Sequence, residues 1–146
     1  MNQVERIIQV ATCIRNGAVV LGGYTQGDGI LVDVRKDGVS LPGLPYWIGS
    51  AGREGDALRQ HAEVILAIQH PPGTMLVGAG YDTGRGSGNG YMVIACGMHK
   101  LYNQFIVLLL AASMGWTPWE LTDRIARTSS REYIYRVLRD WIAGVA

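Results

Sequence analysis

Two short motifs combine side chains that could hold a metal ion and move protons. His61 and Glu63 lie two residues apart in the segment HAEVILAI, and Cys96 and His99 lie three residues apart in CGMH. Zinc prefers imidazole nitrogens and thiolate sulfurs as ligands, and a nearby carboxylate can accept a proton from a zinc-bound water. These side chains are therefore chemically able to bind a metal ion.

This pair of motifs resembles the zinc-dependent nucleoside and nucleobase deaminases. That family carries a His-x-Glu motif on one helix and a Pro-Cys-x-x-Cys motif on the next. Here Ala95 precedes Cys96, and His99 stands where the family has its second cysteine. The resemblance implies a zinc cofactor held by His61, Cys96 and His99, and deaminase-like hydrolysis with Glu63 as the catalytic residue. We treat this zinc hydrolase as the alternative hypothesis. The leading hypothesis is a non-enzymatic protein that has neither a catalytic residue nor a cofactor.

A second group of polar side chains lies near the C-terminus. Arginine can bind guanine edges and phosphates, and serine and tyrosine hydroxyls can contact the nucleic-acid backbone. The group consists of Ser129, Ser130, Arg131, Tyr133, Tyr135 and Arg136.

The segment around these residues predicts three helices. Residues 98–114 form an apolar run that ends at Gly115, a residue that favours a helix C-terminus. Thr117 and Glu120 flank a proline in a capping-box pattern, and Ser129 and Glu132 form a second box. The second helix is expected to end near residue 126, so roughly three residues separate it from the third, a spacing typical of a steep crossing.

This C-terminal segment resembles the helix-turn-helix of winged or sigma-region-4-like DNA-binding domains. The resemblance rests on residues 116–121, 125–126 and 130–139. In such domains the N-terminal part of the third helix enters the major groove. Carried over by position, the resemblance implies that the six polar residues between 129 and 136 contact nucleic acid, DNA in particular. It also implies that the protein is a nucleic-acid-binding regulator, which we expect to be a homodimer.

Upstream, the pattern alternates between helices and strands. We predict helices over residues 3–15, ended by Asn16-Gly17, and over residues 57–70, ended by two prolines. Strands are predicted over 18–22, 30–34, 74–79 and 91–96, the first two forming a hairpin. Asp37-Gly38 predicts a turn, and residues 40–56 predict no regular element. The glycines of 84–90 indicate either a long mobile hairpin tip or a loop that covers a ligand.

These elements predict an α+β (or α/β) protein with a small sheet of about four strands flanked by helices, followed by the three-helix unit. We expect residues 1–97 and 98–146 to pack as one compact domain. The chain of 146 residues is 48% hydrophobic and 17% charged, which is typical of a buried core.

Charge and cysteine content limit the location and partners. The net charge is +1, and residues 98–146 carry six Lys/Arg against four Asp/Glu, a modest excess for a nucleic-acid partner. Cys13 and Cys96 lie in apolar segments and are expected to be free thiols in a reducing compartment, so we predict a cytoplasmic protein. No segment is predicted to enter a membrane. A protein-binding module or inhibitor without catalysis is the third hypothesis.

Overall fold

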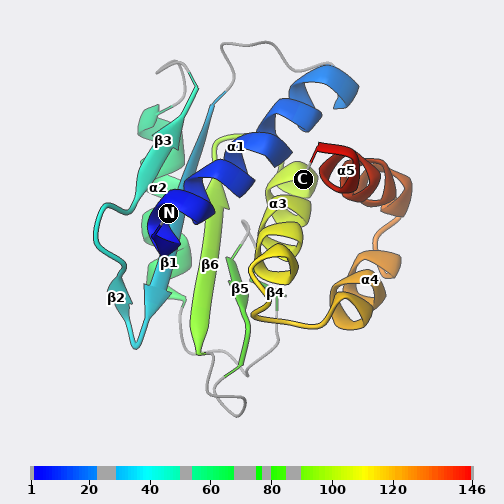
Figure 1. The fold of residues 1–146 in the computed structure, drawn as a ribbon. Helices are drawn as coiled ribbons and strands as arrows, with labels where there is room; N and C mark the ends of the chain where they lie inside the picture. The colour runs from blue at the N-terminus through cyan, green and yellow to red at the C-terminus, as the bar shows by residue number, and fades with distance from the viewer. Residues whose placement is uncertain are drawn as a thin grey trace.

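An antiparallel β-sheet runs through the middle of the protein and has helices on both faces (Figure 1). The computed structural model describes residues 2–22, 29–49, 54–67, 75–76, 80–84 and 90–145. Within these ranges the strands are β1 Ile30–Lys36, β2 Val39–Ser40, β3 Tyr46–Ile48, β4 Met75–Leu76, β5 Gly80–Asp82 and β6 Tyr91–Cys96. Their order is β2-β1-β6-β5-β4, and β3 also pairs with β1.

The helices are α1 Gln3–Gly22, α2 Glu54–Leu66, α3 Lys100–Ser113, α4 Trp119–Arg127 and α5 Glu132–Val145. Together with the sheet they confirm the predicted α+β class, and the predicted three helices at the C-terminus are present. No helix in the described ranges is both long enough and apolar enough to cross a membrane.

Side-chain alternation along β1 separates two hydrophobic layers. Ile30, Val32 and Val34 belong to the larger layer, beneath α1 and α3, whereas Leu31 belongs to a smaller layer beneath α2. Figure 1 shows α1 and α3 on one face of the sheet and α2 on the other. The larger layer extends through α4 and α5, so residues from both sides of position 97 pack in one core.

The first helix is longer than predicted. It continues through Asn16-Gly17 to Gly22, so the predicted helix end, the strand over 18–22 and the hairpin with 30–34 are wrong. The cause is tertiary packing: Gly17 and Ala18 are buried, and the indole of Trp141 in α5 lies directly against Gly17. The Trp141 Nε1–H also donates to the Cys13 carbonyl oxygen at 3.0 Å.

Other predicted boundaries shift for similar reasons. Residues 46–48 form β3 inside the segment expected to be irregular, because β1 offers them a pairing edge. Helix α2 begins at Glu54, three residues before the predicted start. The turn at Asp37-Gly38 is confirmed by φ angles of 53° and 80°. The helix predicted over 57–70 is described only as far as residue 67, and its last three residues lie outside the described residues. Residues 85–89, most of the glycine-rich loop, also lie outside them.

The helix starts near the C-terminus differ from the two predicted capping boxes. Pro118 is the N-cap of α4 and makes no side-chain cap bond, because the Thr117 hydroxyl instead lies 3.1 Å from the hydroxyl of Tyr81 in the core. Before α5, Ser129 Oγ accepts the Arg131 backbone N–H at 3.1 Å, but the Glu132 carboxylate pairs with Arg136. The turn between α4 and α5 forms with only part of the expected capping.

Candidate functional site

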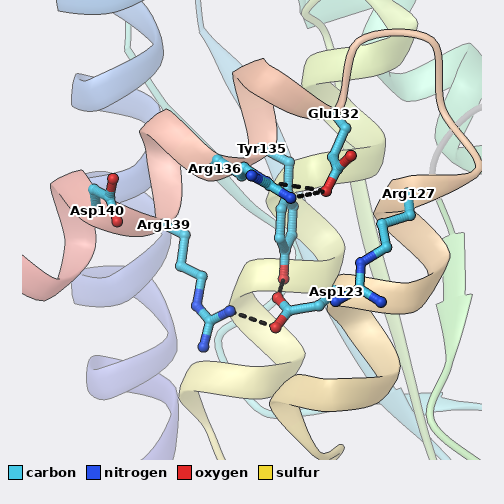
Figure 2. A pocket seen from close by; sticks show the side chains of 7 residues that line it. All are labelled: Asp123, Arg127, Glu132, Tyr135, Arg136, Arg139 and Asp140. Carbon is cyan, nitrogen blue, oxygen red and sulfur yellow. Dashed lines mark hydrogen bonds and ion pairs between the residues drawn. The ribbon is translucent and has the colours of Figure 1, made fainter.

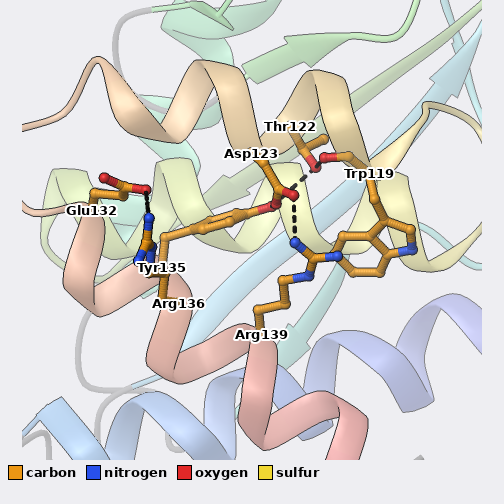
Figure 3. A network of polar contacts seen from close by, with 7 residues as sticks. All are labelled: Trp119, Thr122, Asp123, Glu132, Tyr135, Arg136 and Arg139. Atoms are coloured by element: carbon orange, nitrogen blue, oxygen red, sulfur yellow. Dashed lines mark hydrogen bonds and ion pairs between the residues drawn. The ribbon is translucent and has the colours of Figure 1, made fainter.

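A network of polar contacts fixes α5 against α4 (Figure 3). The Tyr135 hydroxyl lies 2.8 Å from Asp123 Oδ1 and 3.0 Å from Thr122 Oγ1. The guanidinium of Arg139 is ion-paired with Asp123 and lies 4.7 Å from the ring centre of Trp119. A neutral hydroxyl, a carboxylate and a guanidinium therefore hold the two helices at a fixed angle.

Tyr135 does not lie on the surface predicted to meet nucleic acid. Its side chain is only 2% exposed, and it packs edge-on against Phe105. Burial raises the pKa of its phenol above the ordinary tyrosine value. Its assignment as a nucleic-acid contact is therefore wrong, because its position in the α5 register turns it toward the core.

A polar cleft of about 390 Å³ opens beside this network (Figure 2). Its wall carries side chains of both charge signs. The Glu132 carboxylate accepts from Arg136 Nε at 3.0 Å, and Asp123 is paired with Arg139. Two of the three acidic groups in the wall are thus each neutralised by an arginine, whereas Asp140 forms no ion pair with another described residue. The lining residues are Asp123, Arg127, Glu132, Tyr135, Arg136, Arg139 and Asp140.

Three further arginines remain exposed around the same corner. Arg124 and Arg127 lie three residues apart in the last turn of α4 and so share one face, and Arg131 follows in the turn to α5. None of the three forms an ion pair with another described residue. We call this group the arginine corner. The α4 carbonyl ends, which carry partial negative charge, stabilise Arg124 and Arg127 at this position.

A second hollow, of about 400 Å³, lies between this turn and the first turn of α3. Its polar rim includes Lys100 and the residues 128–130, while Phe105 and Leu108 lie among its apolar lining. The Ser130 side chain is exposed, and Ser129 is half-buried. An ammonium group and hydroxyls next to the arginine corner form a surface suited to phosphate oxygens.

The six predicted contacts thus fall into three groups. Ser129, Ser130 and Arg131 lie at the corner, Tyr133 and Arg136 lie further along the exposed face of α5, and Tyr135 is buried. Sequence reasoning missed Arg124, Arg127 and Lys100. The three-residue spacing of Arg124 and Arg127, near the end of the helix that follows Pro118, was the signal that could have identified these two arginines.

The residues predicted as a zinc site are not arranged as a ligand shell. His61 Nε2 lies 2.8 Å from Asp33 Oδ2, and His99 forms the N-cap of α3, where its Nδ1 accepts from the Leu101 N–H. Burial, together with the charges of Asp33 and Glu63, raises the pKa of the Cys96 thiol to about 12. In the ranges described, no three His, Cys, Asp or Glu side chains are grouped to hold a metal ion.

Asp33 is a buried polar centre that the sequence reading missed. It is fully buried, and its Oδ2 accepts from Ser40 Oγ at 2.9 Å as well as contacting His61. Arg35 Nη1 lies 3.9 Å away. The contacts link β1, β2 and α2 and fix the orientation of His61. A single acidic residue inside the apolar run ILVDV was the available signal, since burial of a charge requires partners.

In comparisons with known proteins, no family model, curated protein or solved structure matches the chain.

Proposed function

We propose that this chain is a cytoplasmic nucleic-acid-binding protein that contacts the phosphate backbone through its C-terminal helices. The observation that carries the proposal is the arginine corner, where Arg124, Arg127 and Arg131 are exposed without an ion pair among the described residues. Guanidinium groups that are not neutralised within the protein can displace the counterions of a nucleic acid, which is the main source of such affinity.

The local charge balance supports this surface. Asp123 and Glu132 are the acidic side chains nearest the corner in sequence, and each is already paired with an arginine of α5. The exposed cations at the corner therefore face few competing anions. Lys100 and Ser130 extend the surface toward α3 and could bind a neighbouring phosphate. Free thiols at Cys13 and Cys96 are consistent with a reducing compartment.

We also propose that the protein is a homodimer, because proteins with a helix-turn-helix commonly bind as symmetric pairs. The two alternatives stay predictions. A zinc deaminase-like hydrolase would show stoichiometric zinc by elemental analysis, and its metal would resist dialysis. A protein-binding module would show neither zinc nor affinity for nucleic acid.

The experiment is a fluorescence-anisotropy titration of labelled duplex and single-stranded DNA at low salt. Arg124→Ala, Arg127→Ala and Arg131→Ala are each expected to weaken binding about tenfold or less, as loss of one charge-assisted contact does. Arg59→Ala is the control, because Arg59 is an exposed arginine on α2 whose side chain is 72% exposed and lies 3.9 Å from Asp56. Unchanged affinity in all three corner variants would contradict the proposal.

Glu132→Gln provides a test with the opposite sign. This change removes the anion that now neutralises Arg136 at 3.0 Å, so one more guanidinium becomes available beside the corner. We expect nucleic-acid affinity to rise by a few fold. A loss of affinity would mean that Glu132 itself contacts the ligand or orders the corner.

A further inference from the structure

The hollow between α3 and the turn from α4 to α5 combines an apolar base with a polar rim. Figure 1 shows α4 beside α3. The volume of the hollow, about 400 Å³, falls within the range of about 300–1,000 Å³ that is typical of pockets for small organic molecules. Phe105 and Leu108, each 1% exposed, lie at its base, and the half-buried Leu101 and Ile125 also line it. Such a base suits a flat group with apolar faces.

The rim of this hollow offers hydrogen bonds and positive charge. The Gln104 amide and the Ser130 hydroxyl line the hollow, and neither side chain forms a hydrogen bond with another described residue. Lys100 is exposed and has no ion pair in the described part of the chain. The described lining residues include no aspartate or glutamate. The hollow therefore favours a ligand in which a negative charge lies next to an uncharged group with hydrogen-bonding edges.

The arginine corner borders the hollow along the chain. Ala126 and Thr128 line the hollow on either side of Arg127 in the sequence, and Ser130 lines it next to Arg131. Arg127 itself lines the cleft of Figure 2, whose described lining is charged apart from one tyrosine. A ligand at the corner therefore meets charged groups in one recess and apolar groups in the other. A nucleic-acid strand has this composition, because its charged backbone carries bases with apolar faces.

We infer that the hollow binds one unpaired base of a single-stranded nucleic acid, while Lys100 and the arginine corner bind the neighbouring phosphates. Phe105 and Leu108 contact the ring of the base, and the Gln104 amide bonds to its edge. A base within a duplex cannot make these contacts, because its edge is paired and its faces are stacked on neighbouring bases. This inference rests on the proposed nucleic-acid binding and names the class of ligand.

The test compares two labelled strands of equal length by fluorescence anisotropy, a single-stranded DNA and a strand built of abasic nucleotides. Both strands carry the same number of phosphates, so a difference in affinity reports contacts with bases. The wild-type protein is expected to bind the strand with bases about tenfold more tightly, as contact with one base provides. The salt dependence should be the same for both strands, because the phosphate contacts are shared.

Two variants separate the base contact from the phosphate contacts. Gln104→Leu removes the amide but keeps a side chain of similar size and helix propensity, so the protein should stay folded. This variant should bind the strand with bases about three- to tenfold more weakly and the abasic strand unchanged. Gln9→Leu is the matched control, because Gln9 is an exposed glutamine on α1. Lys100→Ala should weaken binding of both strands alike and lower the salt slope by about 0.7.

The outcomes distinguish this inference from the proposed function. Equal affinity of the wild-type protein for the two strands would overturn the inference, and so would a Gln104→Leu variant that binds the strand with bases as the wild type does or loses affinity for both strands equally. Binding of either strand would still support the proposed function in these cases. A wild-type protein that binds neither strand nor duplex DNA would refute the proposed function, and this inference with it.

Discussion

Replacing Gly17 with alanine tests the contact that extends α1 through its predicted end. Alanine favours a helix over glycine by about 1 kcal/mol, so local propensity alone predicts stabilisation. The structure predicts the opposite, because the added β-carbon would lie 2.7 Å from Trp141 Cδ1 and 2.9 Å from its Nε1. These atoms belong to a rigid ring that is half-buried between α1 and α5 and cannot move away freely.

The magnitude follows from two losses. Overpacking costs about 1–3 kcal/mol, and displacement of the indole weakens its 3.0 Å hydrogen bond to Cys13, worth about 1 kcal/mol. After the propensity gain is subtracted, we expect Gly17→Ala to lower the free energy of unfolding by about 1–3 kcal/mol. For a chain of this size the melting temperature should fall by about 3–10 °C.

The assay is urea unfolding followed by tryptophan fluorescence. Gly55→Ala in α2 is the control, because a β-carbon there meets nothing within 4 Å and the change should be neutral or stabilising. In a Trp141→Leu background the Gly17→Ala change should lose most of its cost. If Gly17→Ala stabilised the wild-type protein as much as Gly55→Ala does, the packing of α5 on α1 would be wrong.

Three other perturbations test the core and the polar network. Burial raises the pKa of Cys96 from 9.0 to about 12, so the contribution of the neutral thiol to the free energy of unfolding is complete below pH 9 and is lost as the pH rises toward 12. In that window, urea unfolding should show the free energy of unfolding falling faster with pH in the wild-type protein than in Cys96→Ala, by about 1.4 kcal/mol per pH unit. Tyr135→Phe should cost about 1–3 kcal/mol in urea unfolding, since Asp123 loses its hydroxyl donor. Asp33→Ala should cost about 3–5 kcal/mol in the same assay, whereas Ser40→Ala, which removes one donor, should cost less. Equal effects of the last two would contradict the role of Asp33 as the shared acceptor.

Local signals predicted those elements whose stability is set locally. The apolar run before Gly115 and the Asp37-Gly38 turn needed no distant partner, so helix α3 and the β1–β2 turn could be predicted. Strand β6 also followed from its β-branched, apolar composition. By contrast, Asn16-Gly17 is a helix terminator by local rules, and only the indole of Trp141, more than 120 residues away in sequence, explains why the helix continues.

The candidate site was predictable to a similar degree. The short turn between α4 and α5 could be predicted from the serine that caps α5 and from the short spacing between the two helices. Ser130 and Arg131 lie in this turn as expected. The inward position of Tyr135 depends on where α5 packs against α4 and α3, which a helical pattern with two alternative tyrosines does not decide. The role of Asp33 depends on strand pairing and on α2, so it required the three-dimensional structure.

The salt dependence of nucleic-acid binding tests the role of the arginine corner most directly. Each phosphate contact contributes a slope of about 0.9 in a plot of log affinity against log salt concentration for duplex DNA. The triple variant Arg124→Ala/Arg127→Ala/Arg131→Ala should therefore lower that slope by about 2.7 relative to the wild type. A triple variant with the same slope and affinity as the wild-type protein would show that this corner does not bind nucleic acid.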